Sequence, residues 1–117
     1  MYRRELLKGS TETLILSLLS ENPMYGYQLV KEMERRSMGY FRLKEGTLYP
    51  ALHRIERDGV IEGRWELSEN GQSRRYYHVT RQGLDRLADL RSEWHDFIHA
   101  VSLIADHVRP LPRAVAV

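Results

Sequence analysis

The chain has 117 residues, contains no cysteine and carries a formal net charge of +2. A chain of this length forms one domain and buries about two-thirds of its unfolded surface. The lack of cysteine excludes a disulfide framework and a thiolate metal site, and it is compatible with a reducing cytoplasm. The apolar run Leu14 to Leu19 is too short to span a membrane, and there is no signal-peptide cleavage pattern. Because the net charge is small, affinity for nucleic acid must depend on where the charges lie.

Two helices are predicted in the first third of the chain. Ser10 can cap the first helix, which carries Glu12 in its first turn and has a buried face made of Leu14, Ile15, Leu18 and Leu19. A Ser-Glu-Asn-Pro segment ends this helix. The second helix begins at about Tyr25 or Gly26, runs to Arg36 and buries Leu29, Val30 and Met33.

The third predicted helix begins between Glu45 and Thr47 and stops at Gly59. Pro50 requires such a start, because proline is tolerated in the first turn, where its missing N–H has no partner to lose. Gly59 can adopt the left-handed conformation that ends a helix. The apolar stripe consists of Leu48, Ala51, Leu52 and Ile55. At about 100° per residue, the opposite face carries Gly46, Pro50, His53 and Arg57, flanked by Tyr49 and Arg54.

A β-hairpin follows this helix. The segment from Val60 to Leu67 alternates, with one side formed by Ile61, Gly63, Trp65 and Leu67. Asn70-Gly71 predicts a tight turn, although the loop can extend from Ser68 to Ser73. The return strand alternates Arg75, Tyr77 and Val79 with Arg74, Tyr76 and His78.

The return strand and its surroundings contain no acidic residue from Asn70 to Leu84. Arginine side chains beside tyrosines suit contact with phosphates, because the cation positions the backbone and the hydroxyl adds a hydrogen bond. The alternative is a solvated hairpin in which an arginine pairs with Glu66 or Glu69.

Thr80 can cap a last, long helix that runs to about His107, or about 40 Å at 1.5 Å per residue. Its apolar positions alternate by three and four residues, with one interruption at Arg91, and comprise Leu84, Leu87, Trp94, Ile98, Val101, Ala105 and Val108, widened by Phe97 and Ile104. A helix of this length gains little by packing on a small domain, so we expect a second copy of the chain to cover it. The alternative is that it folds back on its own core. Two prolines then begin a frayed tail.

The order of three helices, a two-stranded wing and a long helix predicts a mainly α fold, the winged form of the helix-turn-helix. We divide the chain into a DNA-binding domain (1–79), a dimerisation helix (80–109) and a flexible tail (110–117). In this fold one helix enters the major groove of double-stranded DNA, and the wing contacts the phosphates beside it. The predicted DNA-binding residues are Thr47, Tyr49, Pro50, His53, Arg54, Arg57, Gln72, Ser73, Arg74 and Arg75. A homodimer would hold two such helices about one DNA turn apart on a palindromic operator.

Four motifs together resemble the PadR family of bacterial transcriptional regulators, over roughly residues 6 to 108. They are Leu7-Lys8-Gly9-Ser10, Pro23-Met24-Tyr25-Gly26-Tyr27-Gln28-Leu29, Glu45-Gly46-Thr47-Leu48-Tyr49-Pro50-Ala51-Leu52 and Arg74-Arg75-Tyr76-Tyr77. The resemblance implies a cytoplasmic, homodimeric winged-helix repressor of the short form, with a single C-terminal helix, that releases DNA on binding a small effector. A common family pattern has histidine where this chain has Tyr25.

The resemblance also implies a place for dimerisation and, in some members, for the effector, between the C-terminal and first helices. The residues that would line an apolar cavity for a planar aromatic molecule, or form the dimer interface, are Leu14, Leu18, Trp94, Phe97, Ile98 and Val101. The alternative is that Trp94 only fills the dimer core.

Other functions are less well supported by the residues. His95 and His99 lie four apart on one helical face, a spacing that can hold a transition metal, which leaves a metal-responsive regulator as an alternative. No nucleophile elbow, ordered triad or glycine-rich phosphate loop is present, so we expect neither an enzyme nor a cofactor. A winged-helix module for protein–protein assembly is the main rival to DNA binding.

Overall fold

The computed structural model describes residues 10–112. Its elements in chain order are α2 (Thr11–Leu19), α3 (Gly26–Arg36), α4 (Glu45–Arg57), β1 (Ile61–Leu67), β2 (Ser73–Val79) and α5 (Arg81–Ala105). The Leu7-Lys8-Gly9 part of the first motif and residues 113–117 of the predicted tail lie outside the described residues. The α5 helix ends at Ala105, two residues before the predicted end at His107.

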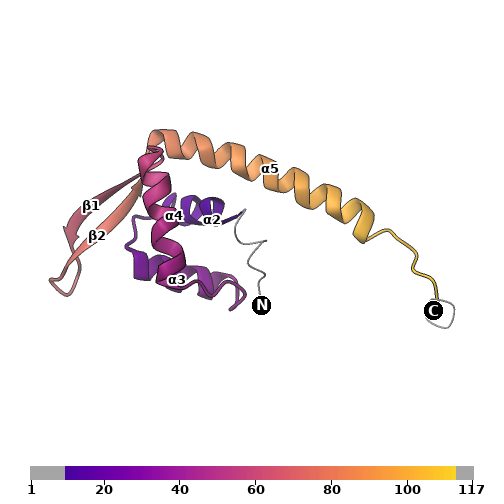
Figure 1. The fold of residues 1–117 in the computed structure, drawn as a ribbon, viewed down its shortest axis with the longest axis horizontal. Coiled ribbons are helices and arrows are strands. Elements are labelled where there is room, and N and C mark those ends of the chain that lie inside the picture. The colour runs from indigo at the N-terminus through magenta and orange to yellow at the C-terminus, as the bar shows by residue number, and fades with distance from the viewer. Residues whose placement is uncertain (1–9, 113–117) are drawn as a thin grey trace.

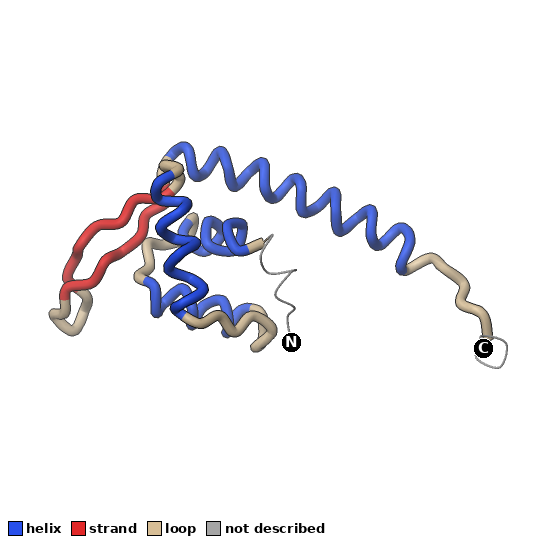
Figure 2. The backbone as a smooth tube through the Cα atoms, viewed as in Figure 1, coloured by secondary structure: helices blue, strands red, loops and turns tan. Residues whose placement is uncertain are grey.

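Three helices, α2, α3 and α4, form a small cluster, with the β1–β2 hairpin standing at one side (Figure 1). The α5 helix starts beside the hairpin, crosses over the cluster and then extends well beyond it (Figure 2). The molecule therefore measures 64 × 27 × 21 Å. This arrangement is a winged helix-turn-helix with a projecting C-terminal helix, as predicted.

The first helix begins where expected but is not capped as expected. Ser10 occupies the N-cap position, yet its side chain makes no capping hydrogen bond. The reason is its backbone, which is helical at φ −117° and ψ −7°, whereas a capping residue normally has extended dihedrals. The buried face also differs, because Leu16 is fully buried while Leu14 is only half-buried.

The α4 helix confirms the predicted start and stop but not the position of proline. Pro50 is the sixth residue of the helix and lies inside it, not in its first turn. At the other end, Gly59 has φ +83°, and the N–H of Val60 donates to the carbonyl of Ile55 at 3.2 Å. A left-handed residue followed by this bond is the Schellman ending of a helix.

The hairpin is a two-stranded antiparallel sheet in which Gly63 pairs with Tyr77 and Trp65 with Arg75. Its loop covers residues 68–72, and Gly71 has φ +83°. Met24 forms an isolated bridge to the free edge of β2. Its N–H donates to the carbonyl of Tyr77 at 3.3 Å, and the N–H of Tyr77 donates to the carbonyl of Met24 at 2.9 Å. The sequence did not indicate this bridge, which ties the loop before α3 to the wing.

The residues of β1 form a strand as predicted, but the side that carries Ile61 is buried only at its inner end. Ile61 is buried, whereas Trp65 and Leu67 are 68% and 76% exposed. Both strands run beyond the helices toward the tip, so the outer half of this face has no core to cover it (Figure 1).

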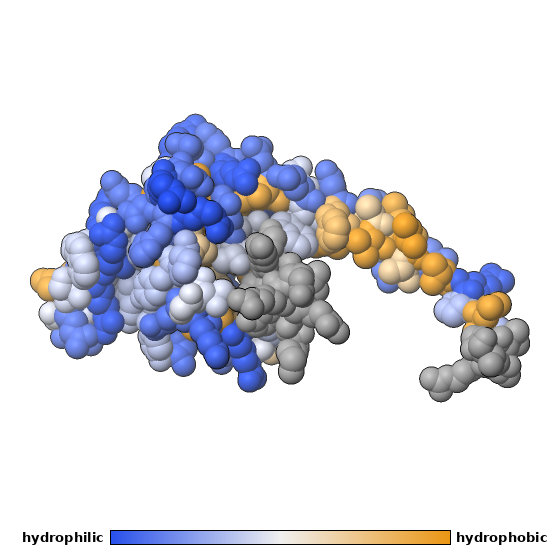
Figure 3. Space-filling view, viewed as in Figure 1, coloured by the Kyte–Doolittle hydropathy of each residue, from blue (hydrophilic) through white to orange (hydrophobic). Residues whose placement is uncertain are grey.

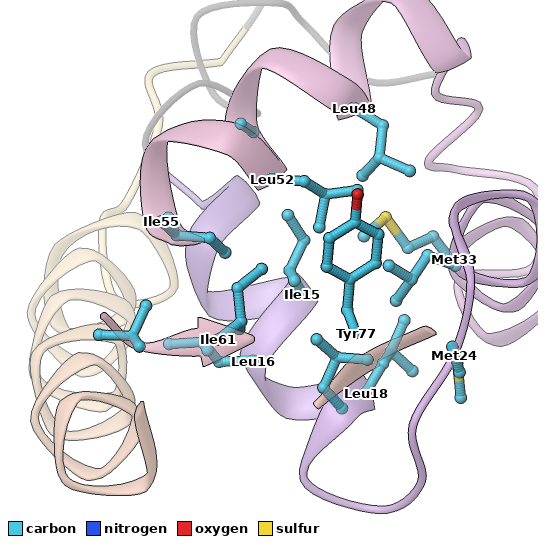
Figure 4. Packing of buried hydrophobic residues seen from close by; sticks show 14 of the residues in the cluster. Ile15, Leu16, Leu18, Met24, Met33, Leu48, Leu52, Ile55, Ile61 and Tyr77 are labelled. Atoms are coloured by element: carbon cyan, nitrogen blue, oxygen red, sulfur yellow. The ribbon is translucent and has the colours of Figure 1, made fainter. Parts of the chain in front are cut away.

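Tyr77 occupies the centre of the core (Figure 4). Its ring enters from β2 between side chains of α2, α3 and α4, including Ile15, Met33 and Leu52. Burial raises the pKa of its phenol because removal from water penalises the phenolate. Leu87 of α5 joins the same cluster.

The start of α5 is fixed against the end of α4. The Oγ1 atom of Thr80 accepts from the N–H of Gly83 at 3.0 Å, as predicted for a cap, and donates to the carbonyl of Gly59 at 2.7 Å. The N–H of Thr80 donates to the carbonyl of Val60 at 3.1 Å. These bonds join the last helix of the cluster, the wing and α5 at one point.

Candidate nucleic-acid interface

The side of α4 that faces away from the core is polar and open to solvent. Leu48, Ala51, Leu52 and Ile55 are buried, which turns the opposite residues outward. The exposed set comprises Gly46, Thr47, Pro50, His53, Arg54 and Arg57. Within residues 10–112, neither Arg54 nor Arg57 has a carboxylate partner. Two unpaired guanidinium groups on an exposed helix are available to bind an anion.

Tyr49 differs from the other predicted residues of this helix. It is half-buried and packs against the core, and its hydroxyl comes so close to Gly26 that a Cβ atom there would lie 2.5 Å from it. Any side chain at position 26 would displace this ring. Tyr49 therefore fixes the approach of α4 to the start of α3.

Arg74 is held on the wing by aromatic and polar neighbours. Its guanidinium carbon lies 4.4 Å from the ring centroid of Tyr25, and one Nη donates to Oε1 of Gln72 at 2.5 Å. The ring of Tyr25 in turn packs edge-on against Tyr76, with centroids 5.4 Å apart. Arg74, Tyr25 and Tyr76 line part of a hollow of about 480 Å³ between the wing and the start of α3. A cation over an aromatic face keeps its charge while losing rotational freedom, so Arg74 is positioned in advance.

Arg75 lies on the opposite face of the wing and has a carboxylate partner. One Nη donates to Oε2 of Glu56 at 2.8 Å, and its guanidinium carbon lies 5.9 Å from the ring centroid of Tyr77. The alternative in which a wing arginine pairs with Glu66 or Glu69 is wrong for the described residues. Glu66 contacts His78 at 2.7 Å, and the carboxylate bound to Arg75 comes from α4.

The tip of the wing is polar and exposed. Gln72 and Ser73, two of the residues predicted to bind DNA, are exposed. The loop is closed by the N–H of Ser68, which donates to the carbonyl of Gln72 at 2.7 Å, while the Ser68 hydroxyl donates to the side chain of Asn70. The loop thus has a defined conformation and leaves Arg74 at its edge.

Two further exposed cations precede α4 and are not among the residues predicted from the sequence. Arg42 and Lys44 are exposed in the turn between α3 and α4, and Arg42 donates to the carbonyl of Gly39 at 3.2 Å. Met38 and Gly39, at φ 54° and 83°, form the left-handed bend of this turn. The signal was available, because residues 35–44 contain four basic and no acidic side chains.

The outer half of α5 exposes an apolar surface. Phe97, Ile98 and Val101 are 58%, 56% and 47% exposed, and apolar atoms gather over this part of the helix (Figure 3). Trp94 packs edge-on against Phe97 with centroids 5.7 Å apart, beside a surface hollow of about 340 Å³. Within residues 10–112, no helix is long and apolar enough to cross a membrane.

The two leucines predicted to share this surface lie elsewhere in the single chain. Leu18 is 7% exposed and belongs to the core, whereas Leu14 is half-buried against it. Neither lines the hollow beside Trp94. The helical period explains this, since Leu18 follows Ile15 by three residues and shares its buried face.

His95 and His99 are both exposed on α5. In the described part of the chain, no group of three or more His, Cys, Asp or Glu side chains is placed to hold a metal ion.

Comparisons with known proteins agree with this geometry. Residues 15–89 match the transcriptional regulator PadR-like family. The chain is 33% identical over 88 residues to Transcriptional regulator Rv3488 of Mycobacterium tuberculosis, covering 75% of this chain and 78% of that protein. It is similar to a solved PadR-like transcriptional regulator from Bacillus cereus, at a TM-score of 0.78 and 32% identity, with coverage of 86% and 95%. A solved transcriptional regulator from Clostridium thermocellum is also similar, at a TM-score of 0.81 and 28% identity, with coverage of 90% and 99%.

Proposed function

The chain belongs to the PadR-like family of transcriptional regulators, and from this membership we propose that it is a homodimeric, sequence-specific DNA-binding repressor whose release from DNA is controlled by a small molecule. Such a regulator acts on the chromosome, in the cytoplasm. Its partners are a palindromic double-stranded operator and a second copy of the chain.

The observation that carries DNA binding is the outer face of α4. It presents His53, Arg54 and Arg57 to solvent, and the two arginines have no carboxylate partner within residues 10–112. A helix of 13 residues with such a face fits the major groove, where arginine can donate two bonds to guanine. Arg74, with Gln72 and Ser73, supplies the phosphate contacts from the wing.

The observation that supports a homodimer is the apolar surface of α5. Phe97, Ile98 and Val101 are about half exposed, and large apolar side chains gathered on one surface commonly mark a protein interface. A second α5 helix offers a matching surface, because a two-fold interface uses the same residues on both copies. Dimerisation would also place two α4 helices on the two halves of an operator.

The hollow beside Trp94 supports a small-molecule effector. It is lined by Leu90, Glu93, Trp94 and Phe97, and its two aromatic rings suit a planar aromatic compound. A ligand bound there would change how the two α5 helices pack and so the spacing of the α4 helices. For the ligand to release the protein from DNA, it must bind more tightly to the conformation that does not bind DNA than to the conformation that does.

The proposal is tested by selecting binding sites from random DNA duplexes and titrating the selected duplex at several salt concentrations. We expect a palindromic site, and an affinity that falls with salt by about 0.9 log units per log unit for each phosphate contact. If no duplex is enriched and no salt-dependent binding is measured, the protein does not bind DNA. The exposed Trp65 and Leu67 of the wing would then favour the protein–protein assembly module.

A further inference from the structure

Glu56 joins the DNA-facing helix to both strands of the wing. Its Oε2 atom accepts from the backbone N–H of Gly63 in β1 at 3.0 Å and from an Nη of Arg75 in β2 at 2.8 Å. In the sequence, Glu56 directly precedes Arg57 of the exposed α4 face. One carboxylate oxygen therefore holds α4, β1 and β2 together beside the candidate interface.

The position of Arg75 is shaped by its surroundings as well as by this bond. A Cβ atom on Gly63 would lie 2.4 Å from Nε of Arg75, so the guanidinium occupies space that any other residue at position 63 would fill. The ring of Tyr77 lies beneath it. The side chains of Arg75 and Glu56 are nevertheless 37% and 26% exposed, so the pair is accessible from solvent.

The two neighbouring arginines of the wing thus differ in whether a carboxylate compensates their charge. Arg74 rests on the neutral ring of Tyr25 and forms no ion pair in the described part of the chain, so no bound carboxylate compensates its charge. Arg75 has its charge compensated by Glu56. Because non-specific DNA binding depends on the number of phosphates that free cations can neutralise, this difference has a consequence for selectivity.

We propose that Glu56 masks Arg75 and thereby limits binding to DNA of the wrong sequence. This inference rests on the proposed DNA-binding function and assigns Glu56 as a specificity-determining residue that acts through Arg75. While the pair is intact, the wing offers phosphates one free arginine, and selectivity depends on contacts of α4 with bases. The same pair fixes the position of the wing relative to α4.

The test compares binding of the parent and of Glu56→Gln to a selected operator and to a random-sequence duplex. Glu56→Gln removes the anion and frees Arg75, so we expect the salt slope for random DNA to become steeper by about 0.9. We expect the ratio of operator to random affinity to fall by roughly threefold or more, since one further phosphate contact strengthens random binding without adding a base contact.

Two controls separate masking from a simple change of net charge. Glu12→Gln removes a carboxylate from a similar pair, in which Glu12 and Arg86 are 20% and 46% exposed and 3.1 Å apart, between α2 and α5. It should leave the salt slope at the parent value. The double variant Glu56→Gln/Arg75→Gln removes both charges of the wing pair, and its slope should return to the parent value because no arginine is freed.

A second variant tests the same proposal without changing any charge. Gly63→Ala places a methyl group where the guanidinium of Arg75 lies and displaces it from Glu56, a movement that a flexible side chain allows. It should also steepen the salt slope for random DNA, and it carries the test if thermal unfolding shows that Glu56→Gln does not fold.

The outcomes distinguish this inference from the function on which it rests. If the parent binds no DNA at any salt concentration, the proposed function fails. If the parent binds its operator but Glu56→Gln has the slope of Glu12→Gln, only the masking is wrong. A steeper slope that persists in the double variant would also overturn it, because the gain would then not come from Arg75.

Discussion

The guanidinium of Arg74 lies over the ring of Tyr25, with its carbon 4.4 Å from the ring centroid. The two residues are 49 positions apart, and the bridge between Met24 and Tyr77 brings their segments together. A residue of the loop before α3 therefore positions the cation that we assign to the phosphates. Its orientation is set before DNA arrives, which lowers the entropic cost of making the contact.

Replacing Arg74 with alanine should weaken binding to the operator and to random DNA by a similar factor. The reason is that a phosphate contact carries no sequence information. The salt slope should fall by about 0.9 for the lost contact. Tyr25→Leu should weaken binding to both duplexes less than Arg74→Ala does, because it removes the ring beneath Arg74 but keeps the charge of Arg74. An unchanged slope in Arg74→Ala would place this residue away from DNA.

Replacing His53 or Arg57 with alanine should act on sequence preference. Each change should cost about 1–3 kcal/mol on the operator and relax the preference at one base pair if the side chain contacts a base. The affinity for random DNA should fall less in these two variants than in Arg74→Ala. Arg109→Ala, beyond the end of α5, serves as a control that removes an exposed cation far from α4. If both α4 variants bind the operator like the parent, α4 is not the helix in the major groove.

Trp94 should report on the effector site through its fluorescence. Planar aromatic compounds should quench it to saturation if they bind in the hollow between Trp94 and Phe97. The same compounds should weaken operator binding, and Trp94→Ala should abolish the quenching. Trp65, which is exposed on the wing, is removed by Trp65→Phe so that the signal comes from Trp94 alone. If Trp94→Ala abolishes dimerisation and no compound affects the parent, Trp94 belongs to the dimer core only.

Gly83→Ala should destabilise the protein by about 1–3 kcal/mol or more. A Cβ atom at this position would lie 2.0 Å from the backbone oxygen of Val60 and 2.7 Å from a methyl group of Val79, so α5 would have to shift away from the wing. Chemical denaturation measures the change. Gly46→Ala provides the contrast, because no atom lies within 4 Å of a Cβ at Gly46, and alanine favours a helix over glycine. Equal stability of the two variants would contradict the close packing at Gly83.

Glu32 should contribute to a loss of stability in acid. Its carboxylate accepts hydrogen bonds from Arg35, and these lower its pKa from 4.5 to about 2. Because the folded pKa lies below the unfolded value, the stabilisation is present above pH 4.5 and is lost as the pH falls toward 2. Thermal unfolding between these pH values should therefore vary less in Glu32→Gln than in the parent. Glu34→Gln, on the same helix but without an ion pair among the described residues, should follow the parent curve.

Local features of the fold could be predicted from the sequence because they depend on neighbouring residues. Gly59 ends α4 with a left-handed residue, and Thr80 caps α5 through the N–H of Gly83. The exposed side of α4 followed from the helical period alone. Pro50 and Ser10 show the limit of such rules, since the proline lies inside α4 and not in its first turn, and the helical backbone of Ser10 is not that of a capping residue.

The state of the wing arginines could not be predicted, because it depends on residues distant in the sequence. Arg75 finds its partner 19 residues earlier, in another element, and Arg74 depends on a ring brought near by the Met24 bridge. Alternation placed the two arginines on opposite faces of β2 but did not show what each face contacts. The exposed Arg42 and Lys44, in contrast, are indicated by the sequence itself, because they lie in an acid-free segment, residues 35–44.

The last residues to enter the core come late in the chain. Tyr77 lies at its centre, and Leu87, which is 6% exposed, belongs to the seventh position of α5. During synthesis, a nascent chain that contains only the three clustered helices still lacks both side chains, so its core is incomplete until residue 87 has been added. A fragment that ends at residue 79 would likewise lack Leu87. It would also lack Thr80, whose hydroxyl and N–H donate to the carbonyls of Gly59 and Val60. The proposed division between a binding domain and a dimerisation helix would therefore be one of function, whereas the buried core extends across it.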